Sequence, residues 1–116
     1  MTAAVVYKIC SAGEWDEAEA AGAFSGSPVD LADGYIHFST AAQTPETLRR
    51  HFAGRDGLVL VAVDAAALGS ALRWEPSRGG DLFPHLYAPL PVTAALSVTA
   101  IETDGAGGHV VPSLAP

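Results

Sequence analysis

The chain has 116 residues, of which 49% are hydrophobic and 16% are charged. This length fits one domain, and the composition is that of a folded globular protein rather than a disordered chain. The formal net charge of −7 disfavours broad binding of nucleic acid, which depends on Lys and Arg to neutralise phosphates. The apolar runs are too short for a membrane-spanning helix, and the N-terminus lacks the pattern of a signal peptide. We therefore expect a cytoplasmic domain that does not act at a membrane.

Cysteine and histidine usage limits the metal and redox chemistry that the chain could perform. Cys10 is the only cysteine in the sequence, which excludes an internal disulfide and a zinc site built on paired thiolates. Because Cys10 lies in an apolar run, we expect a buried structural thiol. None of the four histidines forms a His-x-x-x-His pair, so the sequence predicts no metal site.

The first half of the chain predicts alternating strands and helices. Residues 5–10 are β-branched, aromatic or apolar and predict a strand. Ser11 and Glu14 match a capping box, which predicts a helix that ends at Gly22. Residues 24–31 contain Gly, Ser and Pro without a clear period and predict a loop. The elements expected next are a strand over 35–39, a helix over 45–53 and a continuously apolar strand over 58–63 that is buried on both faces.

The second half predicts mainly strands. Asp64 can cap a helical turn over 65–68, and a short strand over 72–75 ends at Pro76. A polar, Gly-rich loop over 77–81 could act as a lid, and strands follow over 83–87 and 96–102. We expect a single α+β domain over residues 1–103, in which a few short helices cover mostly antiparallel sheets. Residues 104–116 are expected to form a flexible C-terminal tail.

The strand over 35–39 carries polar side chains in an apolar setting. Strand side chains alternate between faces, so Tyr35, His37 and Ser39 should share one face. An imidazole beside a hydroxyl can hold a sugar diol or the edge of a phosphate. The alternative is a buried histidine that bonds to a backbone carbonyl.

A second strand repeats this pattern with His85 and Tyr87. Pro84 and Pro89 restrict the backbone on either side, so both rings should be presented rigidly. Tyr87 could stack on a planar ligand, assisted by Tyr35. Alternatively, these rings pack beside the core and keep their polar atoms in water.

Glu75 lies at the end of the short strand between these two segments. Its carboxylate could hold a ribose hydroxyl, stabilise positive charge at an anomeric carbon or act as a general base. Arg78, in the Gly-rich loop, could clamp a phosphate. The alternative is a surface glutamate whose neighbours Arg73 and Arg78 are weak ion-pair partners.

Three segments together resemble the DUF952 family of small, mainly bacterial proteins. They are Asp-Gly-Tyr-Ile-His-Phe-Ser-Thr-Ala-Ala-Gln at 33–43, Arg-Trp-Glu at 73–75 and Phe-Pro-His-Leu-Tyr at 83–87, and the likeness covers about residues 7–101. Members of that family look like the ADP-ribosyltransferase fold, which implies two packed, mostly antiparallel sheets and a central cleft for a nicotinamide dinucleotide.

The resemblance also implies roles for individual side chains. It implies catalytic roles for His37, Glu75, His85 and Tyr87. We expect ligand contacts from Tyr35, His37, Ser39, Thr40, Arg78 and Tyr87. In the superfamily the glutamate usually follows the aromatic position, whereas Glu75 precedes His85 here. Either another residue takes the glutamate's role, or the transfer chemistry is lost.

The leading functional prediction is an enzyme that binds NAD, or a related nucleotide, and transfers or hydrolyses at the nicotinamide–ribose bond. NAD would be a substrate, and no resident cofactor is required. The second prediction is a non-catalytic module that binds a nucleotide or another small ligand. The third is an interaction domain whose histidines are satisfied in the core, although the sequence indicates no particular protein partner.

Overall fold

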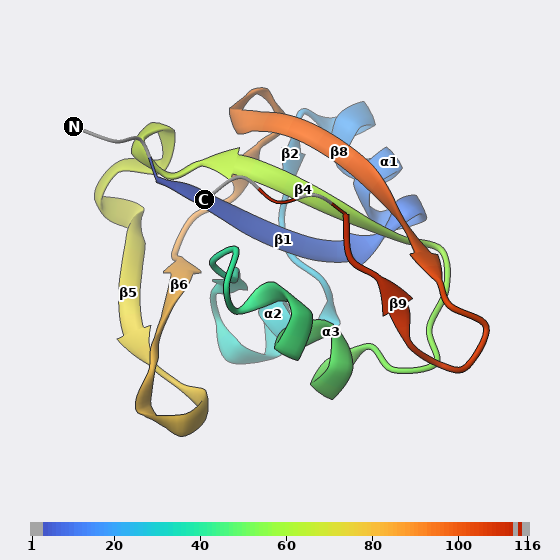
Figure 1. Ribbon diagram of the computed structural model, residues 1–116. Coiled ribbons are helices and arrows are strands. Elements are labelled where there is room, and N and C mark those ends of the chain that lie inside the picture. The colour runs from blue at the N-terminus through green and yellow to red at the C-terminus, as the bar shows by residue number, and fades with distance from the viewer. Residues whose placement is uncertain (1–3, 113, 115–116) are drawn as a thin grey trace.

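Antiparallel sheets form the frame of the protein (Figure 1). The computed structural model describes residues 4–112 and 114 and gives no account of the Arg78 side chain. Within these residues the largest sheet has the order β1 (Val5–Ser11), β4 (Leu58–Asp64), β8 (Ala95–Thr103) and β9 (His109–Val110). A second sheet has the order β3 (Ile36–His37), β6 (Leu82–Leu86) and β5 (Leu72–Pro76). The short strands β2 (Ala23–Phe24) and β7 (Leu90–Pro91) form a third.

Short helices connect the strands. The α-helices are α1 (Ala12–Ala21), α2 (Pro28–Asp33) and α3 (Thr44–His51). Three 3₁₀ segments are η1 (Ala65–Ala71), η2 (Arg78–Gly80) and η3 (Val92–Ala94). Figure 1 shows the β5–β6 hairpin at one side of the molecule, away from β9. Every strand pairing among the described residues is antiparallel, which confirms an α+β fold with mostly antiparallel sheets.

Strand β4 is the centre of the core. Val59, Val61 and Val63 join an apolar cluster that includes Trp15 of α1. Leu58 and Leu60 belong to a separate cluster on the other face, together with Leu48 of α3. Because successive strand residues point to opposite faces, the apolar run of β4 from Leu58 to Val63 packs against both clusters. The prediction of a doubly covered strand is therefore confirmed.

The predicted loop over residues 24–31 is wrong in its second half, where α2 begins. Ser27 is the N-cap residue, Pro28 occupies the first helical position and Asp30 accepts a hydrogen bond from the Ser27 amide at 2.8 Å. Gly34 ends the helix with a φ of 88°, which an L side chain rarely adopts. The Ser-Pro-x-Asp start of this helix is a local capping signal, but the six-residue segment is too short to show an apolar period.

The predicted strand over 35–39 is also shorter than expected. Only Ile36 and His37 pair with β6, and Ser39 instead forms an isolated bridge with Tyr7 of β1. The Tyr7 amide donates to the Ser39 carbonyl at 2.8 Å, and the Ser39 amide donates to the Tyr7 carbonyl at 2.9 Å. The segment thus pairs with one sheet through His37 and with the other through Ser39. His37 is thereby fixed where the two sheets meet.

Within the expected C-terminal tail, the chain turns back and pairs with β8. His109 and Val110 form β9, which pairs with Thr103 and Glu102 of β8. The His109 Nε2 atom lies 2.7 Å from the Arg55 carbonyl oxygen. The mobility of residues 104–116 stays a prediction, and positions 113, 115 and 116 lie outside the described residues.

None of the helices in the described part of the chain is both long and apolar enough to span a membrane.

Replacing Leu48 by Ala tests how α3 is anchored. Leu48 is 2% exposed and packs in the cluster that includes Leu58 and Leu60. We expect Leu48→Ala to lower the free energy of unfolding by about 2–5 kcal/mol, because it removes buried methyl groups and leaves a cavity. The control is Leu31→Ala on α2, where the side chain is 66% exposed and the change should be small. Urea unfolding measures both, and equal losses would contradict the proposed anchor.

Candidate functional site

A buried ion pair joins three elements at the centre of the site. Lys8 of β1 is 4% exposed and Asp30 of α2 is 2% exposed. The Lys8 Nζ atom donates to both carboxylate oxygens of Asp30, at 3.1 Å and 2.8 Å, and to the His37 carbonyl at 3.1 Å. Asp30 also accepts from the His37 amide at 3.1 Å and lies 2.6 Å from His37 Nδ1. One carboxylate therefore positions β1, α2 and both the backbone and the ring of His37.

The charge of Asp30 is held in place by its donors. Burial opposes ionisation and is the largest single influence on this carboxyl. The His37 hydrogen bond, the Lys8 charge and the Ser27 amide together outweigh burial and lower the pKa of Asp30 from 3.8 to about 2. Asp30 is therefore an anion at neutral pH, and its oxygens can only accept hydrogen bonds.

The other ring nitrogen of His37 also faces a carboxylate. His37 Nε2 lies 2.9 Å from an oxygen of Asp33, the last residue of α2. Because a carboxylate only accepts, both contacts are hydrogen bonds only when both ring nitrogens carry protons. The His37 ring is thus clamped between two acidic side chains from one short helix.

Aromatic rings cover His37 and connect it to β6. Tyr35 stacks on His85 with ring centroids 4.1 Å apart and lies 4.6 Å from the His37 ring. His37 and His85 are directly opposite in the β3–β6 register, and their rings meet edge to face at 5.6 Å. Tyr87 lies 5.2 Å from Tyr35. The two histidine segments predicted from the sequence therefore meet in one cluster.

Glu75 binds the outer part of this cluster. Its Oε1 atom lies 2.8 Å from His85 Nδ1 and accepts a hydrogen bond from the Tyr87 hydroxyl at 2.7 Å. The Tyr87 bond, followed by the His85 bond, lowers the pKa of Glu75, and the same contact raises the pKa of Tyr87. The Arg73 guanidinium lies 4.8 Å from the centre of the Tyr87 ring. Glu75 is consequently an anion that holds two aromatic side chains.

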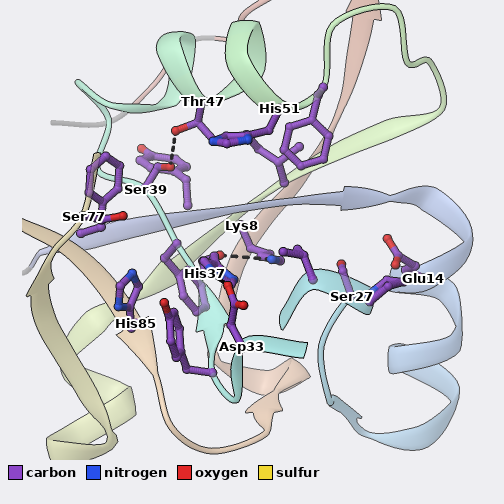
Figure 2. Close-up of a pocket in the computed structure, with 18 of the residues that line it drawn as sticks. Lys8, Glu14, Ser27, Asp33, His37, Ser39, Thr47, His51, Ser77 and His85 are labelled. Carbon is purple, nitrogen blue, oxygen red and sulfur yellow. Dashed lines mark hydrogen bonds and ion pairs between the residues drawn. The ribbon is translucent and has the colours of Figure 1, made fainter. Parts of the chain in front are cut away.

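A cavity of about 790 Å³ opens beside these groups. Figure 2 shows that its walls come from β1, the starts of α1 and α2, the β3 segment, α3 and the β5–β6 hairpin. At the α3 end, the Ser39 hydroxyl lies 2.9 Å from the Thr47 hydroxyl. His51 and Arg55 line the same end. The volume lies within the range of pockets that hold small ligands.

The predicted site residues divide into two groups by their relation to this cavity. Tyr35, His37, Ser39 and His85 line it. Glu75, Tyr87 and Thr40 are not among the lining residues, although Glu75 and Tyr87 touch the His85 side of the cluster. The Thr40 hydroxyl instead accepts from the Gln43 amide at 3.2 Å, just before α3. The side chain of Arg78 lies outside what the structure describes, so its ligand contact stays a prediction.

Three charged residues of the site are not predicted from the sequence. Lys8 lies in an apolar strand, Asp30 lies in a predicted loop, and the sequence indicates only a turn at Asp33. A charged residue inside a buried strand needs a partner, so Lys8 was a usable signal. The identity of that partner, 22 residues away, could not be deduced from spacing.

Cys10 is buried, and burial is the main reason that its pKa rises to about 12. A thiol that stays protonated is a poor nucleophile, which agrees with the structural role expected for it. Among the described residues, no group of three or more His, Cys, Asp or Glu side chains is arranged to hold a metal ion.

Comparison with known proteins gives a family and solved structures of one relative. Residues 9–98 match a family described as "Protein of unknown function (DUF952)". The crystal structure of CC0527 from Caulobacter crescentus is 49% identical, with a TM-score of 0.89, and the match covers 91% of this chain and 93% of that one. The solution NMR structure of the same protein is 50% identical, with a TM-score of 0.80 and 90% of each chain covered. No curated protein matches the chain significantly.

Titration of Asp30 predicts how stability changes in acid. Its pKa is lower in the folded protein than the 3.8 expected for the unfolded chain, so ionised Asp30 stabilises the fold above about pH 4. This contribution, about 2 kcal/mol from the shift to about 2, is lost as the pH falls from 4 to 2. Between pH 4 and pH 2, the free energy of unfolding measured in urea should fall by about 2 kcal/mol less for Asp30→Asn than for the wild type.

The matched control is Asp16→Asn on the exposed face of α1, which should follow the wild-type curve. At pH 7 the Asp30→Asn protein should be less stable by several kcal/mol, because Lys8 loses its buried partner. Parallel acid curves for wild type and Asp30→Asn would contradict the assigned role of Asp30.

Proposed function

The chain belongs to the DUF952 family, and we propose that it binds NAD, or a closely related nucleotide, and cleaves or transfers at the nicotinamide–ribose bond. The observation that carries the proposal is the meeting of His37, Tyr35 and His85 at the wall of one large cavity, with Glu75 bonded to His85. This combination provides polar groups for a sugar, aromatic surface for a base and a carboxylate close to both. These are the kinds of group that the expected resemblance to ADP-ribosyltransferases would require.

The distribution of charge favours an anionic ligand in this cavity. The chain has 13 acidic residues, six Lys or Arg and four His. Five of the ten basic side chains line the cavity, whereas two of the 13 acidic ones do. The basic residues are Lys8, His37, His51, Arg55 and His85, and the acidic ones are Glu14 and Asp33. Lys8, His37 and His85 already contact carboxylates, so a phosphate-bearing ligand would be expected at the end of the cavity lined by His51 and Arg55.

Asp33, which contacts the His37 ring, is suited to hold a ribose. The Asp33 side chain is 45% exposed, and only its Oδ2 atom has a partner among the described residues, namely His37 Nε2. Its other oxygen can accept a hydrogen bond from a sugar hydroxyl. The paired hydroxyls of Ser39 and Thr47 lie farther along the same wall, toward α3. The cavity thus offers acceptors for a ribose and basic groups for a phosphate.

The proposed reaction breaks the bond between the anomeric carbon of the ribose and the nicotinamide nitrogen. Nicotinamide leaves as a neutral molecule with the bonding electron pair, and positive charge develops on the sugar. A hydroxyl of water or of an acceptor then bonds to the anomeric carbon and loses its proton. The Glu75 anion lies close enough to the His85 ring to favour positive charge in this region.

A second candidate is a non-catalytic module that binds a nucleotide or small ligand. The observation that favours it is the position of Glu75 and Tyr87, which are not among the residues that line the cavity. The guanidinium of Arg73 also lies against the Tyr87 ring, which reduces the surface available for stacking. In this case the cavity would bind a ligand that the Glu75 carboxylate does not reach, and no bond of the ligand would be broken.

Incubation with NAD tests the leading proposal. We expect the wild type to release nicotinamide at millimolar NAD, measured by chromatography. Asp33→Asn should weaken NAD binding by about tenfold, because the sugar hydroxyl would then donate to a neutral amide oxygen instead of a carboxylate. The control is Asp81→Asn, an exposed aspartate that does not line the cavity. If the wild type shows no binding of NAD and no release of nicotinamide at millimolar NAD, the proposal is refuted.

Thermal unfolding with nucleotides separates binding from catalysis. A ligand that binds only the folded protein raises the melting temperature by mass action. For the binding module, NAD or ADP-ribose should raise the melting temperature of the wild type, and no nicotinamide should appear. If no nucleotide shifts the melting temperature, the interaction-domain interpretation gains support.

A further inference from the structure

The two histidines of the cluster differ in how many of their ring nitrogens contact a carboxylate. Both nitrogens of His37 lie against carboxylates, at 2.6 Å from Asp30 and 2.9 Å from Asp33. A ring nitrogen that donates to a carboxylate has no lone pair available to receive another proton. His37 is therefore arranged to donate hydrogen bonds and to hold α2, and it cannot accept a proton from a ligand in this arrangement.

His85 has one carboxylate partner instead of two. Its Nδ1 atom lies 2.8 Å from Glu75 Oε1, and an ionised carboxylate can only accept, so Nδ1 carries the proton. In a neutral imidazole the other nitrogen, Nε2, then carries the lone pair. No partner for this nitrogen is found in the described part of the chain, and the His85 ring lines the cavity. Figure 2 shows this ring at the edge of the cavity, near Asp33 and His37.

The His85 ring is also held rigidly. Tyr35 stacks on one face at a centroid distance of 4.1 Å and an interplanar angle of 28°. The Tyr87 hydroxyl donates to the same Glu75 oxygen that contacts His85, at 2.7 Å. Glu75 is thereby oriented from a second side. A buried imidazole with a fixed ring, a fixed tautomer and a free lone pair is the usual arrangement of a general base.

We propose that His85 is the proton acceptor of the cavity and that Glu75 is its positioning residue. The inference rests on the proposed function for its substrate, NAD or a related nucleotide, and adds which side chain takes the proton of the attacking hydroxyl. The hydroxyl oxygen bonds to the anomeric carbon while the carbon–nitrogen bond breaks. The hydroxyl proton moves to His85 Nε2, and nicotinamide leaves with the electron pair.

This assignment accounts for the position of Glu75 behind the cavity wall. A glutamate that contacts the sugar directly should line the cavity, whereas Glu75 is absent from its lining and reaches it through His85. It also explains how Glu75 can precede His85 in the chain. The β5–β6 pairing places Arg73 opposite His85 and Glu75 opposite Phe83, so Glu75 reaches the ring diagonally.

Nitrogen-15 NMR of the histidine side chains tests the tautomer without any substrate. In wild-type protein at pH 8, we expect His85 to carry its proton on Nδ1. Glu75→Gln should remove this preference, because an amide can either donate or accept. The control is Tyr87→Phe, which removes the other partner of the same oxygen and should keep the tautomer. A wild-type His85 with its proton on Nε2 would overturn the inference.

Kinetics with NAD then separate a positioning role from direct contact with the sugar. Glu75→Gln should lower kcat by about 100-fold or more, as expected for loss of general base catalysis, and change KM little. Because His85 is buried, His85→Asn is a second variant, used only if its backbone NMR spectrum shows a folded protein. A Glu75→Gln protein that loses activity while His85 keeps the Nδ1 proton would refute the positioning role.

The failure of this inference differs from failure of the proposed function. If the wild type neither binds nor cleaves NAD, the proposed function is refuted, and with it the reaction step assigned to His85. The tautomer measurement still decides whether Glu75 positions the ring. If the wild type cleaves NAD and Glu75→Gln cleaves it equally fast, the proposed function stands and this inference is refuted.

Discussion

The buried pair of Lys8 and Asp30 is the constraint on which the site depends. Removing two charges from water costs several kcal/mol for each ion, so such a pair persists only when its polar atoms are satisfied. Asp30 meets this condition by accepting hydrogen bonds from Lys8, Ser27 and His37. These contacts join β1, α2 and β3. The position of His37 at the cavity wall follows from this electrostatic requirement.

Beside the cavity, the segment that follows β3 is bonded to both main sheets. Tyr7 and Ser39 exchange backbone hydrogen bonds, while the Phe38 amide donates to the Pro84 carbonyl at 3.0 Å. The chain between these contacts cannot shift toward either sheet without breaking one set of bonds. On the far side, α3 is anchored by Leu48 and supplies Thr47 and other lining residues. Rigid elements thus enclose the space instead of mobile loops alone.

The acidic chain concentrates basic side chains and histidines around this space, and their partners give them separate tasks. His37 is bound by two carboxylates and connects α2 to β3. His85 contacts one carboxylate through Nδ1, and its Nε2 atom has no partner within the described residues. The fold that produces this arrangement is shared with CC0527 at 49% identity. The proposed reaction would depend on the protonation of a few side chains that this shared fold positions.

The sequence by itself determined most of the strands and the capped helix at Ser11, because periodicity and capping are local properties of the chain. It also identified His37, Glu75 and His85 as polar residues in apolar or short strands. Only the tertiary structure decided that Asp30 neutralises Lys8 and that Glu75 holds His85 from behind the wall. These pairs join residues 22 and ten positions apart, through strand pairing and burial. The physical reason is that alternation fixes which face a side chain occupies, whereas its partner depends on how the elements pack.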